Sequence, residues 1–160
     1  MKSNLLLPNR FKTIGWLLFA VGILFGIGYF LNYYDYEKGK SFFDTHVFAI
    51  MRGGILGKIT FFSWIENNIL DEIVSFCLIA GGLLIIFSKE KNEDEYISSL
   101  RLNALLWAVF TNHLILIISV LFVYDMIFLW ILEFNMFTII FIFLSRFYWL
   151  LHRVSKQTQQ

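Results

Sequence analysis

The sequence predicts an all-α, polytopic membrane protein built as a bundle of four transmembrane helices. Of its 160 residues, 58% are hydrophobic and 16% are charged, whereas about a quarter of the residues in soluble domains are charged. The charges gather in short segments, and the runs between them reach the length of about 18 apolar residues that a membrane span needs. We therefore expect a single membrane domain over residues 1–160.

Four spans account for the apolar runs. At a rise of 1.5 Å per residue, about 20 helical residues cross the hydrocarbon core, which is about 30 Å thick. The turn between the last two spans contains only Tyr124 and Asp125, so these spans must form an antiparallel helical hairpin. The predicted spans cover residues 14–31, 70–88, 102–123 and 126–145.

The lysines and arginines predict the orientation. Nine of the 13 lie in the N-terminal tail, in the loop 89–101 or near the C-terminus, and four lie in the loop 32–68. Positive residues are enriched in cytoplasmic loops, so both termini and the loop 89–101 are expected in the cytoplasm. The loop 32–68 then lies outside.

This outer loop is expected to contain one or two short helices that lie on the membrane surface or cap the bundle. Ser41 and Asp44 have the spacing of a helix capping box. The apolar run 47–51 follows and ends at Arg52-Gly53-Gly54, which resembles a helix stop, and the second apolar piece covers 59–65. An alternative is that the loop forms a lid that recognises a ligand.

The loop 89–101 contains the densest charge cluster, and it allows two interpretations. One is a solvated connection of alternating charge between two helices. The other is a docking site for a cytosolic protein. The docking candidates are its acidic residues, Glu90, Glu93, Asp94 and Glu95.

Glycines mark where helices approach closely. Gly22 and Gly26 form a GxxxG motif in the first span, and Gly81 and Gly82 offer a similar surface in the second. The motif is compatible with packing inside the bundle and equally with a homo-oligomer.

Asparagine and threonine side chains form a predicted seam between the third and fourth spans. At 100° per residue, Asn112 shares a face with Ala104 and Ala108, while Asn135 shares a face with Thr138. Because the connecting turn is short, these two faces should meet near the middle of the bilayer. We expect a structural hydrogen bond from Asn112 to Asn135 or Thr138.

His113 and Glu133 point away from that seam, although both lie in lipid-spanning stretches. An ionisable group at this depth costs a few kcal/mol to insert, so it usually faces protein or water and often serves a function. The two side chains could converge on each other or on the first two helices. A Glu–His pair would suit a proton relay or pH sensor; the alternative is a neutral, hydrogen-bonded pair, or a glutamate that reaches interfacial water.

Several function classes find no support in the sequence. The single cysteine, Cys77, excludes a disulfide framework within one chain, and His46, His113 and His152 fall in three different environments. Catalytic or cofactor motifs and the basic stripe of a nucleic-acid binder are missing from the sequence. We therefore expect no metal, no cofactor, no nucleic acid and no enzyme activity.

Two segments carry a resemblance to known proteins: Asn135-Met136-Phe137-Thr138 within the predicted fourth span, and Arg146-Phe147-Tyr148-Trp149 directly after it. With Leu7–Lys12 and the stretch SKEKNEDEYISSLRL, the chain resembles a family of small uncharacterised four-span bacterial inner-membrane proteins. The resemblance covers most of the chain apart from the outer loop, and Glu133 lies outside it. It implies a multi-pass protein of the bacterial inner membrane; some similar proteins are thought to accompany a helix-turn-helix regulator.

Two functions remain in competition. The first is a non-enzymatic accessory, sensory or regulatory membrane protein that binds a partner, for which the cytosolic loop would supply the docking site. The second is a small proton- or ion-coupled transporter or channel subunit, acting as an oligomer, in which His113 and Glu133 bind and release a proton.

Overall fold

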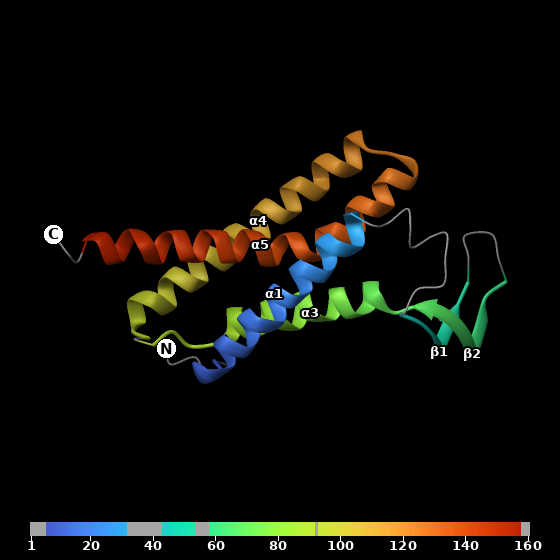
Figure 1. The fold of residues 1–160 in the computed structure, drawn as a ribbon. Helices are drawn as coiled ribbons and strands as arrows, with labels where there is room; N and C mark the ends of the chain where they lie inside the picture. Colours follow the sequence, from blue (N-terminus) through green and yellow to red (C-terminus); the bar gives the residue numbers. More distant parts are fainter. Residues whose placement is uncertain (1–5, 32–42, 54–57, 92, 158–160) are drawn as a thin grey trace.

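The computed structural model describes residues 6–31, 43–53, 58–91 and 93–157. Four long helices and one two-stranded sheet make up these residues, and all four helices are long and apolar enough to cross a membrane. Figure 1 shows the sheet beyond one end of the helices α1 and α3, opposite the end where α5 finishes. The elements are α1 (Arg10–Leu31), β1 (Asp44–Arg52), β2 (Thr60–Asn68), α3 (Leu70–Phe87), α4 (Glu95–Phe122) and α5 (Asp125–Gln157).

The helices correspond to the four predicted spans, although α3 and α4 each end one residue earlier than predicted, and three of the helices are longer than predicted. α1 begins four residues earlier than the predicted span, α4 begins seven residues earlier, and α5 continues twelve residues further. With 33 residues, α5 is about 50 Å long, which exceeds the thickness of a hydrocarbon core. Hydropathy detects only the apolar part of such a helix, so the polar turns at its ends were missed.

Over the described parts of the loop, residues 43–53 and 58–68, the prediction of short helices is wrong, and the chain is therefore not all-α. Strands β1 and β2 form an antiparallel hairpin there, with Phe48 opposite Trp64. Asp44 begins β1 and does not cap a helix, while Ser41, the expected cap, lies outside the described residues. The two apolar pieces are rich in aromatic and β-branched residues, which favour strands.

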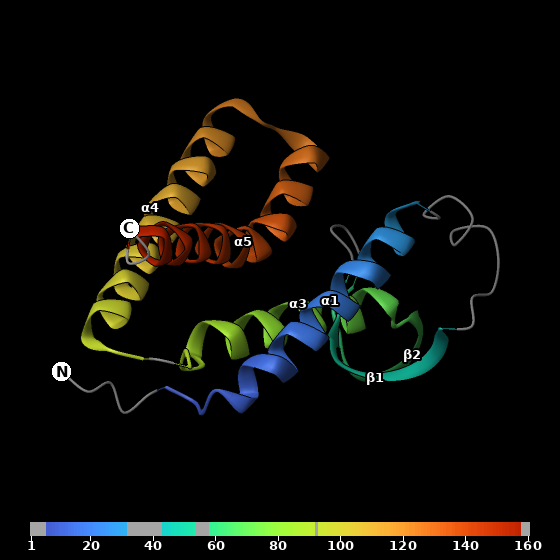
Figure 2. The ribbon, with the colours of Figure 1, turned by 60° about the vertical axis from the view of Figure 1, so that its left-hand side comes forward.

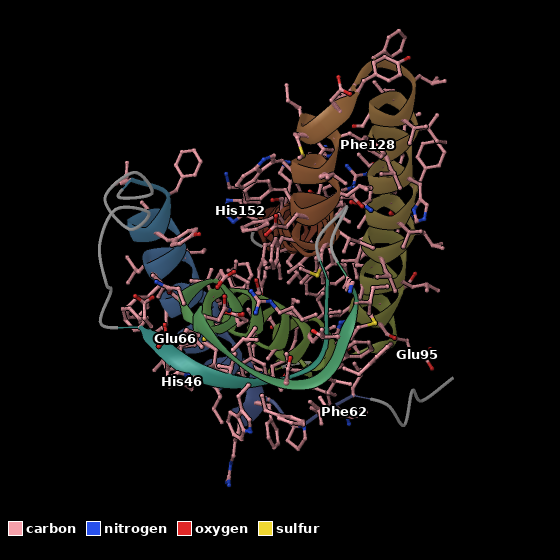
Figure 3. All side chains as sticks on the ribbon, turned by 90° about the vertical axis from the view of Figure 1, so that its right-hand side faces the viewer. His46, Phe62, Glu66, Glu95, Phe128 and His152 are labelled. Carbon is pink, nitrogen blue, oxygen red and sulfur yellow. The ribbon has the colours of Figure 1, made fainter. Side chains whose placement is uncertain are left out.

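Side chains along the hairpin point alternately to one face of the sheet and to the other. Val47, Ala49 and Ile65 are half-buried on one face, whereas Phe48 and Trp64 are exposed on the other. The rings of Phe48 and Trp64 lie 5.5 Å apart, a cross-strand aromatic pair of the kind that stabilises sheets. Figure 3 shows Phe62 projecting on the outer side of the curved ribbon.

α1 and α3 form one antiparallel pair, and glycines set their distance. A Cβ at Gly81 would lie 2.7 Å from the Phe19 backbone nitrogen and 2.9 Å from the Gly15 carbonyl oxygen, so only glycine permits this approach. A Cβ at Gly22 would lie 3.0 Å from Leu78, and one at Gly26 would lie 3.3 Å from Val74. The GxxxG face therefore packs against α3 within the chain.

α4 and α5 form the second pair, and α5 joins it to the first. A Cβ at Gly82 of α3 would lie 2.5 Å from the Cγ2 atom of Ile140. Phe143 and Phe147, also in α5, are buried in the same core as Ala104 and Ala108 of α4. In Figure 2 the two pairs meet near the end of α3 and separate towards the turn between α4 and α5.

Figure 2 also shows that α5 changes direction between its orange first part and its red remainder. Thr138 Oγ1 donates a hydrogen bond of 3.1 Å to the carbonyl oxygen of Phe134, four residues earlier. Such back-bonding often bends helices. The first part of α5 thus follows α4, and the later part crosses α3.

Candidate functional site

Asn112 and Asn135 join the two helices of the α4–α5 pair. Each side-chain amide donates to the other's oxygen, at 3.2 and 3.3 Å. Asn112 is only 6% exposed and shares its buried face with Ala104, Ala108 and Ser119, as the helical periodicity predicted. The predicted hydrogen bond from Asn112 to Asn135 is therefore present, whereas the hydroxyl of Thr138 bonds within its own helix.

His113 follows Asn112 but is exposed, outside the seam. Its Nδ1 atom lies 2.8 Å from the carbonyl oxygen of Val109, in the preceding turn of α4. Because a carbonyl oxygen can only accept, Nδ1 carries the proton of this bond. The other nitrogen of a neutral ring, Nε2, is then a hydrogen-bond acceptor, and it becomes a donor when the ring is protonated.

Glu133 is exposed as well, and it makes no ion pair or hydrogen bond with any residue that the structure describes. It lies two positions before Asn135, so the helical rotation turns it to the side of α5 that faces away from α4. With Asn112 and Asn135 level, Glu133 and His113 differ in depth by only about 1.5 Å. They are nevertheless on different sides of the hairpin, and the chain does not bring them together.

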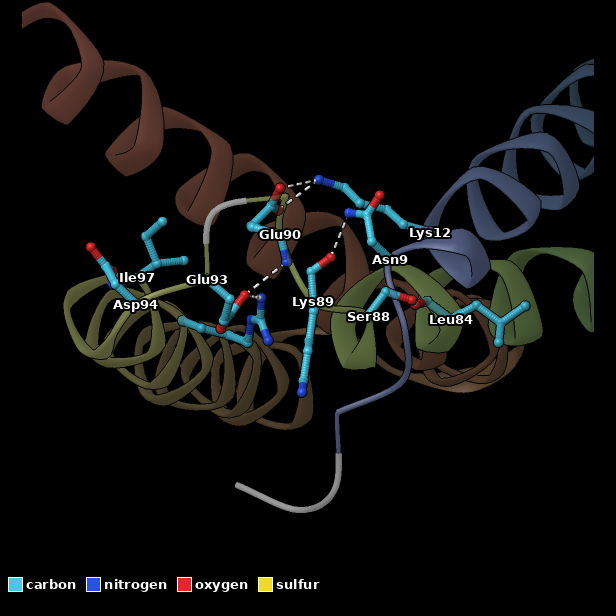
Figure 4. A network of polar contacts seen from close by, with 10 residues as sticks. Asn9, Lys12, Leu84, Ser88, Lys89, Glu90, Glu93, Asp94 and Ile97 are labelled. Carbon is cyan, nitrogen blue, oxygen red and sulfur yellow. Dashed lines mark hydrogen bonds and ion pairs between the residues drawn. The ribbon is translucent and has the colours of Figure 1, made fainter. Parts of the chain in front are cut away.

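Two of the four acidic docking candidates form ion pairs within the chain (Figure 4). Glu90 accepts two hydrogen bonds from Lys12 Nζ, at 2.6 and 2.5 Å, which tie the start of α1 to the α3–α4 connection. Glu93 Oε2 lies 2.8 Å from Arg101 Nη2 and also accepts from the Glu90 backbone nitrogen at 2.7 Å. These four side chains are 10–17% exposed, so the pairs are largely buried.

The other two candidates lie at the start of α4. Asp94 is the N-cap of this helix, and its side chain accepts from the Ile97 backbone nitrogen at 2.7 Å. Glu95, in the first turn, is exposed. Most of the acidic cluster therefore has a structural role in the described chain, and Glu95 alone offers an uncommitted exposed carboxylate.

Sequence reasoning missed a set of contacts between cations and aromatic rings. The guanidinium of Arg146 lies 5.2 Å from the Trp107 ring centre and 5.1 Å from that of Trp149, and Arg153 lies 4.7 Å from Trp149. Lys12 similarly lies 5.1 Å from the ring of Tyr148. The spacings from Arg146 to Trp149 and from Trp149 to Arg153 are three and four residues, the spacings of helix neighbours, and could have revealed the contacts within α5.

The remaining titratable residues are dispersed. His46 and Glu66 face each other across the hairpin at 3.4 Å, both 69% exposed. Glu72, at the start of α3, accepts from Asn67 at 2.6 Å. Within the described ranges, no group of three or more His, Cys, Asp or Glu side chains is placed to hold a metal ion.

The described residues thus define a helical chain with four candidate membrane spans, and the two longest of these helices carry the exposed ionisable side chains of His113 and Glu133 within their apolar stretches. Comparison with protein-family models, with characterised proteins and with solved structures finds no match to this chain.

Proposed function

We propose that this chain is a non-enzymatic, multi-pass protein of the bacterial inner membrane, with both termini in the cytoplasm. In this proposal it is an accessory, sensory or regulatory protein that works by binding a protein partner inside the bilayer. The observation that carries the proposal is the exposure of Glu133, without a partner in the described chain, within an apolar stretch of α5.

Leaving such a group in lipid costs free energy. Ionisable side chains within membrane spans almost always face a protein interior or a water-filled cavity, and they pair with one another or with backbone carbonyls. His113 is exposed at nearly the same depth, and its Nδ1 atom is engaged with Val109, which leaves Nε2 for a contact with another molecule. A partner helix that covers this region would remove both groups from lipid.

This proposal moves the expected docking site from the loop 89–101 into the membrane. Glu90, Glu93 and Asp94 are engaged within the chain, so their charges are less available to a cytosolic partner. Contact with a cytosolic protein through Glu95 remains part of the proposal, because that side chain is exposed.

Photo-crosslinking in living cells tests the proposal. Benzoylphenylalanine at position 133 should give protein adducts, whereas the same group at position 134 should give fewer. Phe134 is a matched control because it is exposed, adjacent and aromatic, and it points about 100° away. Adducts with lipid alone at position 133 would contradict the proposal.

A proton- or ion-coupled transporter or channel subunit is the second candidate. It is supported by the similar depth of His113 and Glu133, but proton exchange requires the two groups to meet, which one chain does not achieve. Flux measurements in proteoliposomes decide between the candidates: coupled transport requires Glu133→Gln to abolish the pH-dependent flux of the wild-type protein.

A further inference from the structure

We infer that the partner covering Glu133 is a second copy of this chain, and that Glu133 of each copy pairs with His113 of the other. This inference rests on the proposed function, because it names the partner that the proposed function requires. The proposed interface does not include the GxxxG motif, because that face of α1 already packs against α3.

The surface lies on the first part of α5 and the facing part of α4. α5 touches α1 and α3 through Ile140, Phe141 and Tyr148, all in its later part. Its first part carries exposed residues on every side except the seam, and Figure 2 shows it diverging from α1 and α3. This region can therefore receive another helix without displacing one of the four described helices.

Charge complementarity favours a second copy as the occupant. A carboxyl group and an imidazole form a hydrogen bond in either protonation state, as carboxylate with imidazolium or as carboxylic acid with neutral imidazole. The bond of His113 Nδ1 to Val109 leaves Nε2 of this exposed ring as the nitrogen that can meet the carboxyl group of another copy. Both groups needed for the contact are present once in each chain, at nearly the same depth.

The helical geometry permits this pairing by two-fold symmetry. His113 points to one side of the plane through α4 and α5, whereas Glu133 points along that plane and away from α4. Consider a two-fold axis that runs parallel to the helices and passes beside α5, on the side to which His113 points. Rotating one copy by 180° about this axis generates a second copy, and each Glu133 then lies next to the other copy's His113. Such an interface is self-complementary, as a closed two-fold dimer requires.

Disulfide crosslinking between copies tests the inference. In a Cys77→Ala background, which removes the native thiol, one tagged copy carries His113→Cys and a differently tagged copy carries Glu133→Cys. Oxidation by copper phenanthroline in native membranes should join the two tags into a species of twice 18.9 kDa. Leu114→Cys, at the depth of Glu133 but turned about 100° from His113, is the matched control and should give little mixed product.

An internal standard makes a negative result informative. In the internal standard, one chain carries both Asn112→Cys and Asn135→Cys in place of the hydrogen-bonded pair. These two cysteines should form an intrachain disulfide at nearly the depth of His113 and Glu133. If this bond forms and the mixed His113/Glu133 product does not exceed the Leu114 control, the inference is wrong.

Exchange of the two groups gives a second readout. We expect Glu133→Gln to weaken dimer formation roughly tenfold, because both symmetry-related contacts lose the charge of the carboxylate. The double exchange His113→Glu with Glu133→His recreates both contacts and should restore the dimer, whereas His113→Glu alone should not. Equal dimer formation by all four proteins in single-molecule photobleaching would overturn the inference.

The two proposals fail in different ways. A photo-adduct at position 133 with a different protein would leave the proposed function standing and overturn the second copy as partner. Absence of any protein adduct at that position would overturn both.

Discussion

Asn112 and Asn135 exchange two hydrogen bonds between α4 and α5, at 3.2 and 3.3 Å. The pair favours one rotation of each helix about its own axis. If either helix rotated, its asparagine would leave the seam and both hydrogen bonds would break. It also turns His113 and Glu133 outward. The ionisable groups therefore lie on other faces of the two helices than the amide pair does.

The first prediction concerns the strength of this pair. Asn112→Ala and Asn135→Ala should each destabilise the protein, and a double-mutant cycle should give a coupling of about 0.6 kcal/mol, with an upper bound of about 1.7 kcal/mol. Unfolding in mixed micelles measures it. Coupling of zero would mean that the two amides do not act as a pair.

The second prediction concerns the contact of α1 with α3. Gly81→Ala would place a methyl group 2.7 Å from the backbone of Phe19, so the helices must separate. We expect a loss of roughly 1–3 kcal/mol, the usual cost of overpacking.

Gly28→Ala is the matched control, because a Cβ at this position would meet nothing within 4 Å. Alanine is the better helix former by about 1 kcal/mol at most, so this variant should melt at the same temperature or slightly higher. Equal melting temperatures for both variants in mild detergent would refute the close approach at Gly81.

The third prediction concerns the acidic loop. Glu93→Gln removes the charge that faces Arg101 at 2.8 Å, in a pair whose side chains are 15% and 10% exposed. Leaving Arg101 without its partner should cost roughly 1–3 kcal/mol. Glu95→Gln, at an exposed position, should change the stability by less than about 0.5 kcal/mol.

Thermal unfolding of the two variants checks this difference, and a pull-down with each variant separates structure from docking. Loss of a cytosolic partner in Glu95→Gln without loss of stability would show that the loop docks a protein. Unchanged stability in Glu93→Gln would contradict the structural role assigned to this pair.

Sequence reasoning located the four long helices because an uninterrupted apolar run long enough to span a membrane forms few structures other than a transmembrane helix. It also predicted that Asn112 bonds to Asn135 or Thr138, since a two-residue turn fixes the relative depth of the helices it joins, and Asn135 is the partner. The failure in the outer loop has an equally clear reason. A short apolar run such as 47–51 fits either a strand or a helix, and the apparent capping box at Ser41 favoured the wrong alternative.

Long-range contacts were beyond sequence reasoning. Lys12 meets Glu90 across 78 positions, and only the packing of α1 against α3 decides which charges become neighbours. For the same reason, the GxxxG motif indicated close packing but did not identify α3 as its partner.

Topology is the central claim, because the depth assigned to Glu133 and His113 depends on four helices crossing the membrane. In a Cys77→Ala background, Thr45→Cys places an exposed thiol on the hairpin, and Ser99→Cys places one near the start of α4. A membrane-impermeant maleimide should label Thr45→Cys in intact cells, and should label Ser99→Cys only after the membrane is permeabilised. The opposite pattern, or labelling of both positions in intact cells, would contradict the account.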